Sequence, residues 1–119
     1  MLTFHSIDSD NNKVIYSTDY KREDNKVIFK DKSAENTDII LTINNDLSLT
    51  FERKGDVNML LPLALGEKKA GFYKSSNGLA FDLNVKTLFL EIKNNKISVE
   101  YELYVMDIIQ THKIWILLH

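Results

Sequence analysis

Two stretches of alternating apolar and polar residues, joined by a short polar linker, constrain the fold of this chain most strongly. The alternation covers residues 79–92 and 97–105. In the second stretch one side carries only apolar or aromatic residues: Ile97, Val99, Tyr101, Leu103 and Val105. A period of two places one set of side chains on a buried strand face and the other in water. The pattern predicts a long β-hairpin from Gly78 to Met106.

The hairpin contains two irregular points. Its linker is Lys93-Asn94-Asn95-Lys96, and asparagine tolerates the positive φ that a two-residue turn requires. Within the first strand Val85 occupies an odd position, whereas Leu88, Leu90 and Ile92 occupy even ones. One extra residue near Lys86 and Thr87 explains this shift, so we expect a β-bulge there.

The rest of the chain predicts further strands. They are expected over residues 2–7, 14–20, 27–30, 38–43, 47–54, 57–63, 70–74 and 108–118. Apolar residues never recur at helical spacing over three turns, and strands every eight to twelve residues indicate a sandwich or barrel. Gly55 marks a bulge or a turn with positive φ, and Pro62 marks a sheet edge or the end of a strand. We predict one domain over residues 1–119, an all-β antiparallel barrel of about eight to ten strands with little or no helix.

Composition narrows the classes of function. The 119 residues include no cysteine, which excludes disulfides and thiolate metal sites and fits a reducing cytoplasm. The formal net charge is −2, and adjacent basic residues occur only as the pairs Lys21-Arg22, Arg53-Lys54 and Lys68-Lys69, so we expect no nucleic-acid partner. No apolar run approaches the roughly 20 residues of a membrane helix, and the first residues do not resemble a signal peptide. We therefore expect a cytoplasmic protein without a membrane partner.

Metal and cofactor sites are not predicted. Asp8, Asp10 and Asn12 have part of the spacing of a calcium-binding loop, but Lys13 stands where that loop needs glycine. His5 and His112 approach each other if the first and last strands are neighbours, yet no carboxylate stands nearby at ligand spacing for zinc. No glycine-rich phosphate loop or nucleophile elbow is present.

The second half of the chain resembles a known family. The residues that carry the resemblance are Arg53-Lys54-Gly55-Asp56-Val57-Asn58-Met59, then Gly71-Phe72-Tyr73, Gly78, Thr87 with Leu88 and Leu90, and Ile97 through Tyr101-Glu102-Leu103. Their order and spacing are similar to those of the YwiB-like family of small bacterial proteins. The resemblance implies a lipocalin-like (calycin) barrel and a cytoplasmic bacterial setting, and it implies no reaction.

Arg53, Tyr73 and Tyr101 are the candidate ligand-binding residues. By parity, Arg53 and Tyr101 each share a strand face with apolar neighbours. A buried guanidinium needs a partner, because an unpaired charge in a core is very costly. One interpretation is an anion anchor inside the barrel, with Tyr101 or Tyr73 as a second donor. The other is that Arg53 extends to the rim and closes the barrel.

Three classes of function follow from these observations. The leading hypothesis is a non-catalytic module that binds a small, partly apolar ligand, which is anionic if Arg53 is its anchor. The alternative is a structural or interaction protein with a filled interior, pairing with itself through the Pro62 strand or the first strand as an exposed edge. An enzyme ranks third, because the residues supply no set of acid, base and nucleophile.

Overall fold

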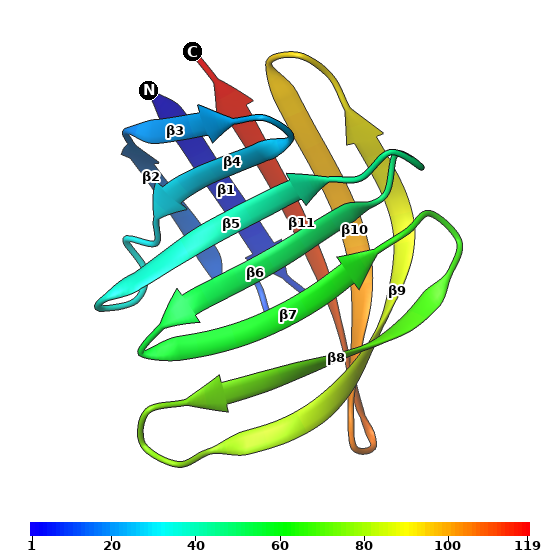
Figure 1. Cartoon of the computed structure of the whole chain (residues 1–119). Coiled ribbons are helices and arrows are strands. Elements are labelled where there is room, and N and C mark those ends of the chain that lie inside the picture. The colour runs from blue at the N-terminus through cyan, green and yellow to red at the C-terminus, as the bar shows by residue number, and fades with distance from the viewer.

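The structure, a computed structural model covering residues 1–119, consists of strands only (Figure 1). Eleven strands form one antiparallel sheet in the order β2-β1-β11-β10-β9-β8-β7-β6-β5-β4-β3. The strands are β1 (Leu2–Asp8), β2 (Lys13–Thr18), β3 (Tyr20–Glu23), β4 (Lys26–Lys30), β5 (Thr37–Ile43), β6 (Leu49–Gly55), β7 (Val57–Leu63), β8 (Lys68–Ser75), β9 (Ala80–Ile92), β10 (Lys96–Val105) and β11 (Ile108–Leu118). The sheet curls into a nearly closed barrel, which confirms the predicted all-β fold. The structure contains no helix long and apolar enough to span a membrane.

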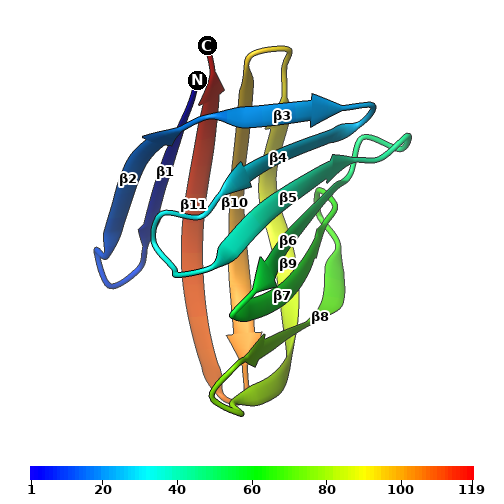
Figure 2. The ribbon, with the colours of Figure 1, turned by 60° about the vertical axis from the view of Figure 1, so that its left-hand side comes forward.

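The structure has eleven strands, one more than the upper end of the predicted range, because the chain bends at Asp19. The stretch expected as a single strand over residues 14–20 divides there into β2 and β3, and β3 continues beyond the expected end to Glu23. β2 and β3 are the two edges of the sheet, so one continuous segment supplies both. β3 crosses the end of the barrel where both termini lie (Figure 2). Arg22 Nη1 there donates a hydrogen bond to the carbonyl oxygen of Asn94, at 3.4 Å.

The long hairpin has the predicted register and bulge. Val85 pairs with Leu103 and Ile92 pairs with Ile97, and the register shifts by one residue between Glu100 and Tyr101. The extra residue is Leu88, whose side chain faces outward and is 42% exposed. The change of apolar parity in β9 is therefore a β-bulge, as the sequence predicts.

The turn of this hairpin differs from the prediction. Neither Asn94 nor Asn95 has a positive φ. The turn instead directs its carbonyl groups toward other parts of the barrel: Asn95 O accepts a hydrogen bond from the backbone N–H of Leu118 at 2.9 Å, and Asn94 O accepts the one from Arg22. Tertiary hydrogen bonds therefore override the local preference of the Asn-Asn pair.

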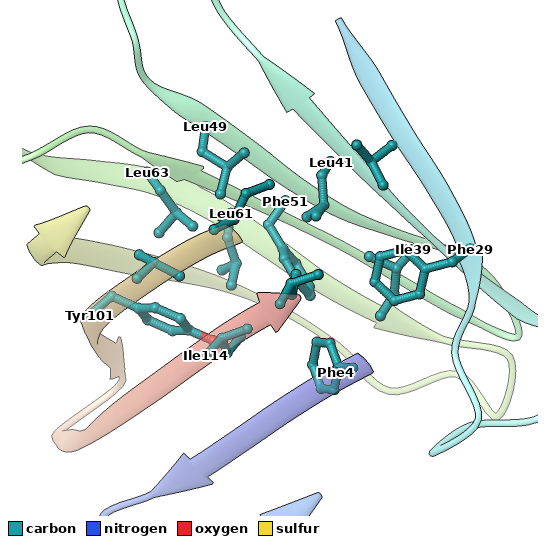
Figure 3. Close-up of a cluster of buried hydrophobic side chains, with 14 of the residues drawn as sticks. Phe4, Phe29, Ile39, Leu41, Leu49, Phe51, Leu61, Leu63, Tyr101 and Ile114 are labelled. Atoms are coloured by element: carbon teal, nitrogen blue, oxygen red, sulfur yellow. The ribbon is translucent and has the colours of Figure 1, made fainter. Parts of the chain in front are cut away.

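The core fills the end of the barrel near the termini. Eighteen buried side chains form one cluster, which includes Phe4, Phe29, Phe51 and Tyr101 (Figure 3). On three neighbouring strands, burial of the inner face falls with distance from the termini. On β11, Leu118, Ile116 and Ile114 are buried, whereas the next inward residues, His112 and Gln110, are only partly buried. β1 and β10 show the same gradient, so the opposite end of the barrel has a looser interior.

The expected edge strands are interior strands. β1 lies between β2 and β11, and β7 lies between β6 and β8. Pro62 pairs with Thr50 on the β6 side, while the ladder between β7 and β8 ends at Leu60. Pro62 therefore lies beyond the end of the ladder between β7 and β8. Its missing N–H is tolerated there, because no carbonyl group of β8 needs it as a hydrogen-bond donor. Self-association through either strand as an edge does not fit this topology.

Gly55 ends β6 at a close backbone contact. Its φ is +143°, a conformation open mainly to glycine, and a Cβ at this position would overlap the carbonyl oxygen of Asn36. The predicted positive φ is confirmed, and the additional constraint is the approach of the chain before β5.

Replacing Gly55 by alanine is expected to destabilise the barrel strongly. Gly66→Ala is the control, because Gly66 also has a positive φ, +77°, but no atom lies within 4 Å of the added Cβ. The control should cost about 1 kcal/mol of backbone strain. Gly55→Ala should cost about 3 kcal/mol or more, because backbone strain and overlap add. Urea unfolding measures both, and equal losses would contradict the close-contact explanation.

Candidate functional site

The loose end of the barrel contains a cavity of about 400 Å³. Its polar lining residues are Ser6, Arg53, Tyr73, Tyr101, Gln110 and His112. Its apolar lining residues are Phe4, Met59, Leu61, Phe81, Leu83, Leu103, Val105, Ile108 and Ile114. The closed end is formed by residues such as Leu61, which is 1% exposed, and the open end includes Ile108, which is 64% exposed. The cavity therefore opens beside the turn between β10 and β11.

A second concavity, of about 390 Å³, lies between the β5–β6 turn and the connection from β7 to β8. Its charged residues are two carboxylates, Asp46 and Glu67, and it contains no cationic side chain. None of the predicted site residues lines it. This concavity therefore offers no cationic group to an anion, whereas the barrel cavity contains Arg53.

Arg53 projects from the end of β6 into this cavity, and its charged partner is Asp31. Arg53 Nε lies 3.2 Å from Asp31 Oδ2, in an ion pair whose geometry is too bent for a hydrogen bond. The Asp31 side chain is fully buried, and 27% of the Arg53 side chain is exposed. The guanidinium makes no hydrogen bond to the protein. Arg53 therefore takes part in closing the barrel and also presents free donors to the cavity.

Asp31 connects three parts of the structure through one carboxylate. Tyr16 on β2 donates its hydroxyl hydrogen to Asp31 Oδ1 at 3.4 Å. The backbone N–H of Ser33 donates to the same oxygen at 2.9 Å, and the Ser33 hydroxyl also donates to it. The sequence analysis placed Asp31 in a polar link and missed this role. The available signal is parity, because Asp31 continues the inward positions of Val27 and Phe29.

The same loop covers the edge of β2. Besides the Tyr16–Asp31 contact, Lys32 Nζ donates to the carbonyl oxygen of Ser17 at 2.6 Å. No backbone ladder joins β2 to β4 or β5, so side chains close the barrel here. We call this junction of Tyr16, Ser17, Asp31, Lys32 and Arg53 the seam.

Tyr101 and His112 form a stacked pair at the inner part of the cavity. They face each other on β10 and β11, with ring centroids 5.2 Å apart and an interplanar angle of 13°. Burial raises the pKa of Tyr101 to about 12, against the opposite influence of the Arg53 charge. Burial also lowers the pKa of His112, as does Arg53, while Asp8 and Asp10 act to raise it. Both groups are therefore neutral at pH 7 in the free protein.

The third predicted residue, Tyr73, lies nearer the mouth. Its ring stacks on Phe81, with centroids 4.9 Å apart and an interplanar angle of 13°. The structure thus places Arg53, Tyr73 and Tyr101 in the lining of one cavity. Sequence reasoning did not place His112 among them, because it considered His112 only with the other histidines.

The histidines and the acidic turn do not form a metal site. His5 faces outward and stacks on Trp115 with centroids 5.0 Å apart, whereas His112 faces inward, so the two rings lie on opposite sides of the sheet. In the β1–β2 turn, the Asp8 carboxylate accepts hydrogen bonds from the backbone N–H groups of Asp10 and Asn12. No group of three or more His, Asp or Glu side chains is positioned to hold a metal ion.

The fold and the cavity place this protein in the class of all-β antiparallel barrels. Its internal cavity is lined by an arginine and two tyrosines, among other residues. Within that class, the chain belongs to the family described as a domain of unknown function (DUF1934), whose family model matches residues 4–116. A crystal structure of the YwiB protein from Bacillus subtilis has the same fold, with a TM-score of 0.69 at 20% sequence identity. The likeness covers 99% of this chain and 89% of that one, and it confirms the resemblance to the YwiB-like family. Among curated proteins, none matches this chain.

Removing the Asp31 charge is expected to weaken the seam. Loss of one partner of a buried ion pair costs about 3–5 kcal/mol. Arg53 is partly exposed, so we expect about 2 kcal/mol for Asp31→Asn in urea unfolding. Asp38→Asn is the matched control, because Asp38 is exposed on β5, and it should stay within about 0.5 kcal/mol. The double variant Asp31→Leu/Arg53→Met should lose less than the sum of its single variants; an unaffected Asp31→Asn protein would contradict the role of the seam.

Alkaline pH is expected to destabilise the fold through Tyr101. Its pKa is about 12 in the folded state and about 10 in an unfolded chain, so the folded state retains the proton longer. The stability contributed by the neutral phenol is present below pH 10 and is lost as the pH rises toward 12. The loss is about 1.4 kcal/mol per pH unit in this window. Urea unfolding at several pH values should show a shallower decline for Tyr101→Phe than for the unmodified protein; parallel declines would argue against this assignment.

Proposed function

We propose that this protein is a non-catalytic binding module for a small, partly apolar ligand that carries an anionic group. The proposal includes a lipocalin-like (calycin) type of barrel and a bacterial cytoplasmic setting, as the family resemblance implies. The cavity volume of about 400 Å³ falls within the range of roughly 300–1,000 Å³ typical of small-molecule sites. A mostly apolar lining with a few convergent polar groups is also typical of such sites.

The observation that carries the proposal is the state of the Arg53 guanidinium. It lies in an otherwise largely apolar cavity and makes no hydrogen bond to the protein, although Asp31 lies beside its Nε. A planar guanidinium offers paired donors that match a carboxylate in a bidentate arrangement. Tyr101 and Tyr73 line the same space, and their hydroxyl groups are available as further donors.

The apolar walls indicate the rest of the ligand. Leu83, Leu103 and Phe81 line the path from the inner polar group toward Ile108 at the mouth. An acid with a short hydrocarbon tail would place its carboxylate at Arg53 and its tail along these side chains. Burial of each methylene group of the tail then contributes about 0.8 kcal/mol.

The chemistry of the lining favours binding over catalysis. The raised pKa of Tyr101 keeps its phenol neutral, so it donates a hydrogen bond and is a poor base at pH 7. Ser6 shares the cavity with His112, but no hydrogen bond joins them, and a serine nucleophile needs an adjacent base. The cavity therefore contains no activated nucleophile.

One observation favours the alternative, a structural or interaction protein that pairs with itself or with another protein. The β10–β11 turn presents apolar side chains to solvent, with Met106 90%, Ile108 64% and Ile109 57% exposed. Exposed apolar residues that are contiguous often mark interaction sites. In this alternative the cavity has no ligand and the turn is the functional surface.

Thermal unfolding with a series of straight-chain carboxylates from butyrate to dodecanoate tests the proposal. A ligand that binds only the folded state stabilises it by about 2.7 kcal/mol at a hundredfold excess over its dissociation constant. We expect such a stabilisation with at least one chain length, and a smaller one with the alcohol of the same length. Arg53→Lys should lose most of the ligand-dependent increase, because lysine cannot provide the bidentate contact.

The matched control for this experiment is Lys54→Gln. Lys54 is the next residue on β6, and its side chain is 61% exposed. It should respond to each carboxylate as the unmodified protein does. The readout is the change caused by ligand in each variant, so that any loss of intrinsic stability at the seam is subtracted. If no carboxylate or alcohol stabilises the unmodified protein, the proposal fails and the interaction protein is favoured.

A further inference from the structure

His112 carries a buried polar atom that the protein leaves without a partner. Its Nε2 is inaccessible to solvent and makes no hydrogen bond, and the ring lines the same cavity as Arg53. A buried polar group without a partner is rare, because the missing hydrogen bond costs free energy. The other ring nitrogen, Nδ1, makes no hydrogen bond either and is not enclosed, so a ligand in the cavity that the ring lines can supply a partner to the imidazole.

The charge balance of the cavity gives the His112 imidazole a specific task. Arg53 and His112 are the only lining side chains that can carry a positive charge, and the Arg53 charge is already balanced by Asp31. A ligand carboxylate bound at Arg53 would leave one uncompensated negative charge in a largely apolar space. Such a charge is costly unless another group neutralises it.

We propose that His112 is a second anion-binding residue of this cavity, and that it takes up one proton when a carboxylate ligand binds between it and Arg53. This inference rests on the proposed function and specifies its ligand as a weak organic acid that is bound together with a proton. The cavity then keeps the same net charge with and without the ligand.

The surroundings of His112 support a neutral ring before binding. Burial and the Arg53 charge lower the pKa of the imidazole, and Asp8 and Asp10 of the β1–β2 turn only partly oppose this effect. Tyr101, stacked on the other face, is neutral. A carboxylate placed beside the ring favours the protonated form and raises the pKa. The free protein thus holds His112 neutral, and the ligand reverses the preference.

Linked protonation predicts a direction for the affinity. Because the complex binds more protons than the free protein, the affinity for the acid must rise as the pH falls. The increase is at most about tenfold per pH unit, within the window between the pKa values of His112 in the free and bound states. Octanoate itself remains ionised from about pH 6 to 8, since carboxyl groups titrate near 4.

Isothermal titration calorimetry with octanoate, at about pH 6 and 8 and in two buffers of different ionisation enthalpy, tests the inference. The unmodified protein should take up between zero and one proton and bind octanoate more tightly at the lower pH. His112→Gln, which keeps a polar side chain, should bind more weakly at low pH, without proton uptake. His5→Gln is the matched control: His5 faces outward against Trp115, and its replacement should leave the pH dependence unchanged.

The outcomes separate this inference from the proposed function. Octanoate binding without proton uptake, or with the same pH dependence in His112→Gln, would overturn the role of His112 and leave the binding module intact. No binding of octanoate or of any other carboxylate of the series at either pH would overturn both. If the His112→Gln variant fails to fold, a nuclear magnetic resonance titration of the His112 ring in the unmodified protein tests the same inference. The pKa of the ring must be higher with octanoate than without it.

Discussion

The barrel depends on a buried carboxylate. Its two edge strands are consecutive in the chain and meet only at Asp19, so backbone pairing cannot close the sheet along its length. Asp31 makes the connection instead, through Tyr16 on one side and Arg53 on the other. Buried ion pairs often contribute little net stability and can still select one arrangement. The position of Asp31 also holds Arg53 at the inner wall, so the closure of the barrel and the character of its cavity have one origin.

Local sequence patterns predicted the parts of the fold in which local and tertiary preferences agree. The parity of β10, the bulge at Leu88 and the positive φ of Gly55 were all visible, because each follows from a two-residue period or from a breaker residue. The turn at Asn94 was mispredicted, since its carbonyl oxygen bonds a distant arginine. The edge strands were misassigned because the position of a strand at an edge depends on the strand order in the sheet. No local sequence pattern encodes that order.

The candidate site was predictable only in part. Arg53 and Tyr101 were identified because a polar group at an inward position is conspicuous among apolar neighbours. Their partners were missed because pairing across strands depends on how the barrel curls. Asp31 lay just past the recognised end of β4. His112 was considered only as a zinc ligand together with His5, and its position opposite Tyr101 was not recognised. A parity count extended beyond each strand end recovers Asp31, whereas the His112 contact requires the register between β10 and β11.

The bend at Asp19 has a consequence for solubility. A long, straight edge strand offers unpaired backbone groups to other chains and promotes aggregation. Here the two edges of an eleven-stranded sheet are a six-residue strand, shielded along part of its side by Lys32 and Asp31, and a four-residue strand that crosses the end of the barrel. The fold thus protects its edges without the continuous ring of hydrogen bonds of a closed barrel. Because only side chains close the barrel at the seam, the seam can open and close again while every strand ladder stays intact.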